Sequence, residues 1–449
     1  MLLINILLGL IGLGVVVFIH ELGHFLAARL VKIEVEAFSI GWGKPILKKK
    51  IKNVEYRLGM FPAGGYCKMK GDSDYNVVWE NRKKGIDPEP DSYHAATPLA
   101  RGIVCFAGPL FNFIFAILLL SILWGFGFEI NTLENKIVLY SELTPGQTYP
   151  ADDAGLQTGD RIIGINGREI SYAHEIQETT SLNPNTPMDL TIDRNGQIIT
   201  TSVTPYLDRS SGAGRIGISF WAYPVIGSIV HGSAAERAGL MQGDLITKVN
   251  GISVQNNIDF LLIREQRPPE FIVEYERAGS RRETSFTPAD IEGELGFSWA
   301  VINYHTPRLS VPAAIVKGVE EGYKTFAASI KSLRLLFMGI DLTQAVSGPV
   351  RITYMIGDIA TQGFGQGLGI GLRSTMEFLA LISIALCVMN LLPLPIIDGG
   401  MIILFIVEGV RKKPLHPKAI AVFQGIGIAI ICGLLLIAVF GDIMFFIRN

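Results

Sequence analysis

Charged residues are scarce in this chain of 449 residues, at 18% of the total, whereas hydrophobic residues make up 49%. Together with a mean hydropathy of +0.36, this composition argues against an ordinary soluble protein. The length allows several domains. The net charge of −2 gives no indication of nucleic-acid binding, and no nucleic-acid partner is expected.

Cysteine is also scarce, with four residues in the whole chain. Three of them, Cys105, Cys387 and Cys432, fall in apolar runs, and Cys67 lies in a polar loop. This distribution excludes a disulfide framework and a cysteine-based metal site. Basic residues are missing ahead of the first apolar run, which continues directly into a motif of polar residues. We therefore expect a retained signal anchor and not a cleaved signal peptide.

The first apolar run contains an H-E-x-x-H motif at residues 20–24. Positions i and i+4 share one face of a helix, so His20 and His24 can direct ring nitrogens at one metal ion. Glu21 lies beside them as a base for an activated water. Two histidines that merely cap or pack a helix are the alternative. However, Asn5 is the sole polar side chain between residues 2 and 19, and ionisable groups within a membrane span are functional by default.

Four membrane-spanning helices are expected, at residues 1–31, 102–128, 376–407 and 419–446. The loops at 32–101 and 408–418 are rich in lysine and arginine, and the positive-inside rule places such loops in the cytoplasm. Both termini then lie outside. The third span is broken by N-L-L-P-L-P-I-I-D-G at 390–399, and such breaks are tolerated only where protein or a cavity satisfies the backbone.

The first cytoplasmic loop has the pattern of a β-hairpin. Residues 34–70 are rich in glycine and β-formers, and Val54, Tyr56 and Leu58 alternate with Glu55 and Arg57. Two interpretations stay open, a plain cytoplasmic hairpin and a hairpin that dips back into the membrane.

An internal repeat occupies the segment between the second and third spans. The pattern A-G-L-x-x-G-D…N-G at 154–167 recurs at 238–251, which predicts two small α+β domains at 129–222 and 223–304. The pattern resembles bacterial PDZ domains, in which a glycine-containing loop binds a peptide carboxylate and the peptide adds a strand. The matching loops here stand at the C-terminal end of each copy, which implies a circular permutation. The alternative is that the copies serve only as spacers. The candidate loop residues are Ile216, Gly217, Ile218, Leu295, Gly296 and Phe297.

Residues 305–375 are expected to form an extracytoplasmic amphipathic helix followed by a loop. Apolar residues recur at helical spacing from Ile315 to Phe337, with lysine and glutamate between them. The apolar stripe can face a protein core or lie on the membrane surface. Residues 362–371 are glycine-rich and predict the loop.

A catalytic zinc needs three protein ligands and an open position, so the histidine pair requires a third partner. With the rise of a helix, His20 and His24 lie about 27–33 Å along the first span. Asp398 lies about 32 Å along the third span, counted from Glu377. Asp398 is also the sole acidic residue between Glu377 and Glu408. We therefore expect one zinc ion per chain near the cytoplasmic face, where it would offset the cost of a buried aspartate.

The same reasoning suggests how a substrate is held. A helical substrate must unwind first, because its carbonyl groups are occupied. The glycine-rich loop, which includes Gly64 and Gly65, could bind the opened segment as an added strand. Asn390 in the broken span could hydrogen-bond the substrate backbone.

Several motifs together resemble the site-2 protease family of intramembrane zinc metalloproteases, and in particular its bacterial sigma-E-regulator branch. They are H-E-L-G-H, F-S-I-G-W-G, P-A-G-G-Y-C-K-M, G-P-x-x-N-F at 108–113 and N-L-L-P-L-P-I-I-D-G. The resemblance implies that His20, His24 and Asp398 bind zinc and that Glu21 is catalytic. It also matches Asn390, Pro393 and Pro395 to the third-span motif of the family.

The family resemblance further implies a multi-pass protein of the bacterial inner membrane that cleaves single-pass membrane proteins. Its substrates would be an anti-sigma factor and remnant signal peptides, and its PDZ domains would control substrate access. Two other functions compete with this one. A transporter also has broken helices and intramembrane charges, although H-E-x-x-H is typical of hydrolases. An inactive membrane scaffold that presents two PDZ modules is the other.

Overall fold

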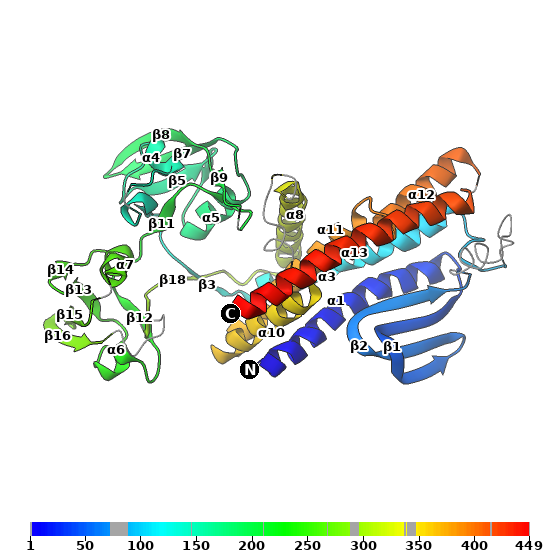
Figure 1. The fold of residues 1–449 in the computed structure, drawn as a ribbon, viewed down its shortest axis with the longest axis horizontal. Helices are drawn as coiled ribbons and strands as arrows, with labels where there is room; N and C mark the ends of the chain where they lie inside the picture. The colour runs from blue at the N-terminus through cyan, green and yellow to red at the C-terminus, as the bar shows by residue number, and fades with distance from the viewer. Residues whose placement is uncertain are drawn as a thin grey trace. The chain divides into compact units, whose positions relative to one another are not determined.

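The computed structural model describes residues 2–71, 89–144, 146–209, 211–266, 268–287, 296–335, 338, 347–413 and 415–448. The chain divides into two compact units. A helical unit comprises residues 1–128 and 306–449, and a β-rich unit comprises residues 129–305 (Figure 1).

The helical unit contains the long apolar helices that the sequence predicts. Its helices are α1 (Leu2–Leu30), α3 (Pro98–Phe126), α8 (Val311–Leu335), α10 (Pro349–Gly365), α11 (Leu368–Leu391), α12 (Asp398–Arg411) and α13 (Pro417–Arg448). Among the described residues, four segments are long and apolar enough to cross a membrane, within α1, α3, α11 and α13. Figure 1 shows both termini at the same end of this unit, as an even number of crossings requires.

The stretch expected to be a loop before the third span instead contains helix α10. Its glycines allow close helix packing: a Cβ on Gly357 would collide with the backbone of Asn5, and one on Gly9 with Thr353. Asn5 donates a hydrogen bond to Asp358 at 3.0 Å, so the one polar side chain early in α1 is satisfied by α10. The loop predicted at 362–371 is confined to Gln366 and Gly367, because residues 362–365 end α10 and residues 368–371 begin α11. Phe337, the predicted end of the amphipathic helix, lies outside the described residues.

The predicted hairpin is present as β1 (Val35–Ile51) and β2 (Val54–Met69). Ala37 is paired with both Glu55 and Lys68, so the first part of β1 lies between two parts of β2. The sheet packs on α1 through aromatic side chains, with the Phe25 and Phe38 ring centroids 5.3 Å apart. This packing fixes the hairpin beside the H-E-x-x-H helix.

The β-rich unit repeats one arrangement twice, as the sequence predicts. The strand orders are β6-β5-β7-β8 and β14-β13-β15-β16. In both copies the Asn-Gly turn has positive φ, at 50° for Asn166 and 51° for Asn250, which suits a tight hairpin. The two copies form one compact unit. Its first strand in the chain, β3 (Glu129–Thr132), pairs with its last, β18 (Ile302–His305).

The remaining elements of this unit follow the same order in each copy. The first copy has β4 (Ile137–Leu139), a 3-10 turn (Tyr140–Glu142), α4 (Pro150–Asp153), β5 (Arg161–Ile165), β6 (Arg168–Glu169), α5 (Ala173–Ser181), β7 (Met188–Arg194), β8 (Gln197–Val203), β9 (Tyr206–Leu207), β10 (Gly214–Arg215) and β11 (Ile218–Phe220). The second has β12 (Ile226–Ile229), α6 (Ala234–Arg237), β13 (Leu245–Val249), β14 (Ile252–Ser253), α7 (Asn257–Glu265), β15 (Phe271–Arg277), β16 (Ser280–Phe286) and β17 (Phe297–Trp299).

Equivalent ion pairs show how closely the copies correspond. Arg194 donates to buried Asp160 at 2.8 Å, and Arg277 donates to buried Asp244 at 2.6 Å. Burial alone would raise the pKa of Asp244, but hydrogen bonds from Arg277 and the Met241 N–H hold that pKa below its ordinary value. Each arginine thereby ties the strand β7 or β15 to the loop that carries the repeated Gly-Asp.

Candidate metal centre and peptide groove

The H-E-x-x-H motif lies on the half of α1 that packs against the hairpin. The Nε2 atoms of His20 and His24 are 3.1 Å apart, and their rings meet edge to face with centroids separated by 4.7 Å. Both side chains are largely buried, with 13% and 11% exposed. Spacing of one helical turn thus brings both ring nitrogens to one point, as the sequence predicts.

Asp398 reaches the same point from the first residue of α12. Its Oδ2 lies 3.3 Å from His20 Nε2 and 3.6 Å from His24 Nε2. Ligand atoms bound about 2.0–2.2 Å from a tetrahedral zinc are separated by roughly 3.3–3.6 Å. The two distances to Asp398 lie in this range and the 3.1 Å between the histidines is just below it, so the three side chains can hold a zinc ion with little rearrangement. Among the described residues they form the one such group of potential ligands.

A tight segment between α11 and α12 sets the position of Asp398. Ile396 has φ of 81°, a conformation that a β-branched residue rarely adopts. Gly399 and Gly400 lie against the carbonyl groups of Leu392 and Leu394, so any Cβ at either glycine would collide with backbone. Strained residues of this kind cluster at functional sites. The glycines after Asp398 let the chain fold back and begin α12 with its aspartate facing α1.

The other ring nitrogens of the two histidines are held by α3. His24 Nδ1 lies 2.8 Å from the carbonyl oxygen of Val104, which accepts its proton. His20 Nδ1 lies 3.3 Å from the Asn112 amide nitrogen, while the buried Oδ1 of Asn112 has no partner among the described residues. With the Asn112 amide turned by half a rotation, its Oδ1 faces His20 and accepts the proton on Nδ1. Both Nε2 atoms are then free to bind metal.

Gly108 supplies the space in which the histidines lie. A Cβ at this position would be 2.4 Å from His24 Nε2 and 2.8 Å from His20 Cε1. Gly108 and Asn112 belong to the G-P-x-x-N-F motif at 108–113. Their contact with the histidines was not predicted, because it depends on how α1 and α3 pack.

Glu21 stands between the metal centre and strand β2. Its carboxylate accepts a hydrogen bond from the backbone N–H of Cys67 and lies near His24 and Asp398. A Cβ on Gly65 would be 3.0 Å from Glu21 Cγ. The final part of β2 therefore borders the candidate base with its backbone.

The remaining predicted substrate residues lie on α11, on the segment before α12 and on β2. Asn390 is half-buried near the end of α11. Pro393 and Pro395 lie in the tight segment before α12, and Pro395 packs against Gly427 of α13. Gly64 lies against the Trp42 ring, with a φ of 154°. Of the predicted set, Gly65 is the one placed beside Glu21.

The first copy of the repeat contains an open groove of about 530 Å³ between α5 and β11. Ile216, Gly217 and Ile218 line one end of it, and Gly217 has a φ of 84°. Strand β11 pairs with β4 on one edge, and no other described strand pairs with it. The groove thus combines a glycine loop, a strand with an available edge and a facing helix.

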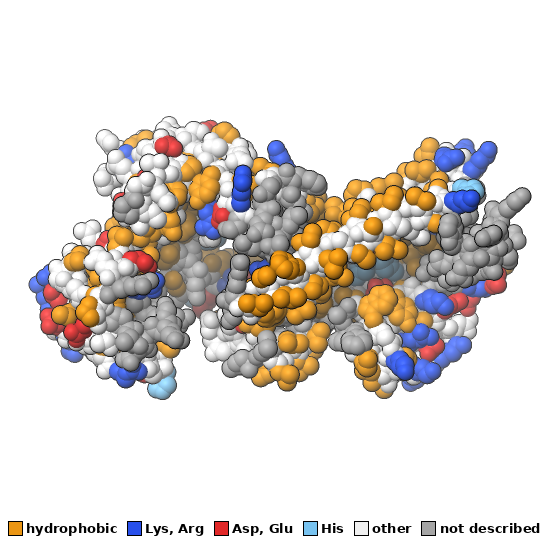
Figure 2. Space-filling view, in the orientation of Figure 1, with side chains coloured by type: hydrophobic (Ala, Val, Ile, Leu, Met, Phe, Trp, Pro, Cys, Tyr) orange, Lys and Arg blue, Asp and Glu red, His pale blue; other side chains and the backbone are white. Residues whose placement is uncertain are grey.

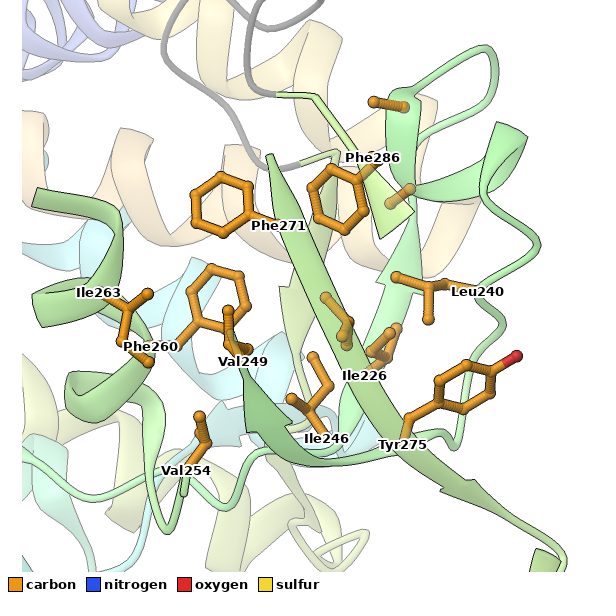
Figure 3. Packing of buried hydrophobic residues seen from close by; sticks show 13 residues of the cluster. Ile226, Leu240, Ile246, Val249, Val254, Phe260, Ile263, Phe271, Tyr275 and Phe286 are labelled. Carbon is orange, nitrogen blue, oxygen red and sulfur yellow. The ribbon is translucent and has the colours of Figure 1, made fainter. Parts of the chain in front are cut away.

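The second copy has aromatic side chains in the equivalent place. Phe260 of α7 lies 5.6 Å from Phe297 and 5.4 Å from Trp299 between ring centroids, and both of those residues belong to β17. Figure 3 shows Phe260 within the core of this copy, beside Phe271. The first copy has Ile176, Ile218 and Phe220 in these positions. Gly296 keeps the loop conformation, with φ of 75°, and Leu295 lies outside the described residues.

Known proteins resemble this chain along almost its whole length. Residues 8–434 match the family described as Peptidase family M50. A putative zinc metalloprotease of Treponema pallidum is 35% identical over 98% of this chain and 99% of its own. The regulator of sigma E protease of Haemophilus influenzae is 30% identical over 97% of both chains. The regulator of sigma-E protease of Salmonella typhimurium is 29% identical over 98% of both.

Proposed function

Because this chain belongs to peptidase family M50, and is therefore a zinc metalloprotease of the membrane, we propose that it cleaves peptide bonds inside membrane-spanning segments. His20, His24 and Asp398 hold one zinc ion, and Glu21 is the catalytic base. The observation that carries the proposal is the spacing of three ligand atoms, 3.1–3.6 Å apart, beside Glu21 on an apolar helix.

The chain's own residues supply the proton transfers and the orientation of the substrate. Zinc held by the three side chains would polarise the scissile carbonyl group and make an attacking water more acidic. Glu21 removes a proton from that water and passes it to the leaving amine. The Cys67 N–H orients the Glu21 carboxylate, while Asn112 and the Val104 carbonyl orient the histidines.

Strand β2 offers a place for an unwound substrate. Residues 65–69 of β2 pair with the start of β1, and the edge next to Glu21 carries Gly65 and the Cys67 backbone. A substrate added as a strand there would present its backbone to Glu21. Asn390, beyond the metal centre, donates to the substrate backbone, and Pro393 and Pro395 keep the segment before Asp398 rigid.

The experiment that tests the function uses purified protein in lipid vesicles with a single-pass membrane protein. The relatives named as sigma-E regulators suggest anti-sigma factors as substrates, and remnant signal peptides are a second class. Mass spectrometry of the products should place the new chain ends within the membrane segment. Cleavage confined to water-exposed regions would contradict the proposal.

The charge distribution supports a cytoplasmic position for the metal end of the helical unit. Figure 2 shows basic side chains gathered at the end of this unit where α12 ends and the hairpin lies. Exposed Lys48, Lys49, Lys50, Lys412 and Lys413 contribute to it. By the positive-inside rule this end faces the cytoplasm, and both termini face outward.

Labelling of single cysteines should report this orientation. In a chain whose own cysteines are replaced, a cysteine at Lys49 should react with an impermeant thiol reagent only after the membrane is opened. A cysteine at Gln255, which is exposed in the β-rich unit, should react while the inner membrane is still sealed. The reverse pattern would invert the topology and place the β-rich unit inside.

We assign control of substrate access to the β-rich unit, with peptide binding in its first copy. The open groove between α5 and β11 can accept an added strand, and the Ile216–Ile218 loop can bind a carboxylate. Aromatic packing fills the matching space of the second copy. The first copy then recognises a newly cut chain end, and the second supplies bulk.

Paired glycine substitutions separate these two roles. Gly217 and Gly296 both have positive φ, and a Cβ would collide with Tyr149 or Ser233 respectively. Gly217→Ala should let the protease cut a substrate whose external domain is intact, whereas Gly296→Ala should leave selectivity unchanged. Product yield from cut and uncut substrates is the measurement.

Deleting residues 137–304 should abolish selectivity altogether. If a stable, zinc-loaded deletion variant stayed selective, substrate selection would depend on another part of the chain, for example α8.

A further inference from the structure

An apolar groove of about 790 Å³ lies between α1, α3 and α12. It is lined by Leu26, Ile103, Phe106, Phe405 and Ile406. Gly102 of α3 also lines the groove and places no side chain in it. A Cβ added to Gly102 would meet no atom within 4 Å. The groove therefore has room for an apolar chain of the size that ligand pockets usually accept.

A second cavity, of about 390 Å³, adjoins the groove where α12 ends. The two cavities share Pro98 and Gly409, and the charged residues Lys412 and Lys413 are part of the lining of the second. Both lysines are exposed, and neither forms an ion pair with any described residue. An apolar groove and a pair of available cations thus form one continuous surface at the end of the bundle.

Arg101 lies at the junction of the two cavities with one donor unused. The side chain is buried, with 7% exposed; it donates to Glu408 at 2.5 Å and stacks on the Phe405 ring, 4.6 Å from the centroid. Its buried Nε has no hydrogen-bond partner among the described residues. A buried N–H without an acceptor is costly. Arg101 and its partner Glu408 both line the second cavity, beside Lys412 and Lys413.

From these observations we infer a binding site for an anionic phospholipid, with acyl chains in the groove and the phosphate near Arg101, Lys412 and Lys413. Basic pockets beside membrane helices recognise such headgroups. Free phosphate would leave the groove uncovered, and a phospholipid fills both parts with one molecule. The site goes beyond the proposed proteolysis. It also borders the metal centre, because Ala107 lines the groove directly before Gly108, which lies against the histidines.

Lipid retention on the full-length protein tests the inference. The protein is placed in nanodiscs of phosphatidylcholine with added phosphatidylglycerol, and native mass spectrometry counts the lipids that stay bound after gentle release. Phosphatidylglycerol should be retained in preference to phosphatidylcholine. The double change Lys412→Ala and Lys413→Ala should weaken that preference by about fivefold for each lysine removed. Lys49→Ala with Lys50→Ala removes equal charge from the hairpin and should have no effect.

A groove-filling variant tests the apolar part separately. Gly102→Phe should displace the acyl chains and lower retention of phosphatidylglycerol. Gly433→Phe is the matched control, because a Cβ at Gly433 of α13 also meets open space but lies outside the groove. Equal retention of both lipids by the unmodified protein would overturn the inference. So would unchanged retention in the lysine variant together with weaker cleavage of acidic substrates, which would identify a substrate contact instead. The lipid-retention measurements themselves do not depend on proteolysis.

Discussion

Replacing Glu21 with Gln should abolish proteolysis while the protein keeps its zinc. Glutamine has the shape of glutamate but cannot remove a proton from water, and loss of a general base lowers rates by about 10²–10⁴-fold. The three ligand side chains are unchanged, so zinc stays bound. Cleavage of a single-pass substrate in vesicles and metal content by mass spectrometry are the two measurements.

A matched change controls for the loss of one carboxylate in the helical unit. Glu377→Gln removes a carboxylate of α11 that accepts a hydrogen bond from Arg373 at 2.9 Å, away from the metal centre. That variant should cleave at a normal rate. If the Glu21→Gln protein lost its zinc, Glu21 would be a ligand, and the division between base and ligands would be wrong.

The Glu21→Gln experiment also distinguishes a protease from the two other functions considered from the sequence, a transporter and an inactive scaffold. Family membership makes the chain a metalloprotease. An inactive scaffold would tolerate Glu21→Gln without any change in the cell's membrane proteins. A transporter would bind its substrate without cutting it.

Much of the metal centre was predictable because its signals are local or follow from membrane depth. The two histidines lie one helical turn apart, and Asp398 is the sole acid in a long apolar stretch. The alternation of apolar and charged residues at 54–58 also predicts the hairpin. Each of these inferences needs only helix rise, strand period and the cost of burying charge.

The rest depends on packing between distant segments, which no local pattern encodes. Asn112 meets His20 across 92 positions of the chain. Residues 362–371 were expected to be a loop because their glycines resemble turn signals, whereas most of them lie at the end of α10 and the start of α11, where Gly363 lies against Gly371 and Ser374. The difference between the two repeat copies rests on the size of three side chains in each, while the repeat pattern itself is shared. The shared repeat pattern therefore gave no indication of this difference in side-chain size.

Removing the proposed zinc ligands should have the second large effect, and the losses should be graded. His24→Ala and Asp398→Asn each leave two of three protein ligands, so both proteins should purify without stoichiometric zinc and without activity. Asp358→Asn is the matched control for aspartate. It changes a half-buried carboxylate of the same unit that contacts Asn5 and not the metal centre, and that variant should keep zinc and activity.

The zinc affinity and activity of Asn112→Ala should lie between those of the ligand variants and those of the Asp358→Asn control. Asn112 touches the His20 ring on the side away from the proposed metal, so its loss frees the imidazole to rotate without removing a ligand. Groups in this position typically change metal affinity by about 10–100-fold. Competition with a zinc chelator of known affinity would measure the shift, and added zinc should restore much of the activity to Asn112→Ala but not to His24→Ala. Full zinc affinity in the Asn112 variant would show that the contact does not position His20. Complete loss of zinc would make the amide itself part of the ligand set.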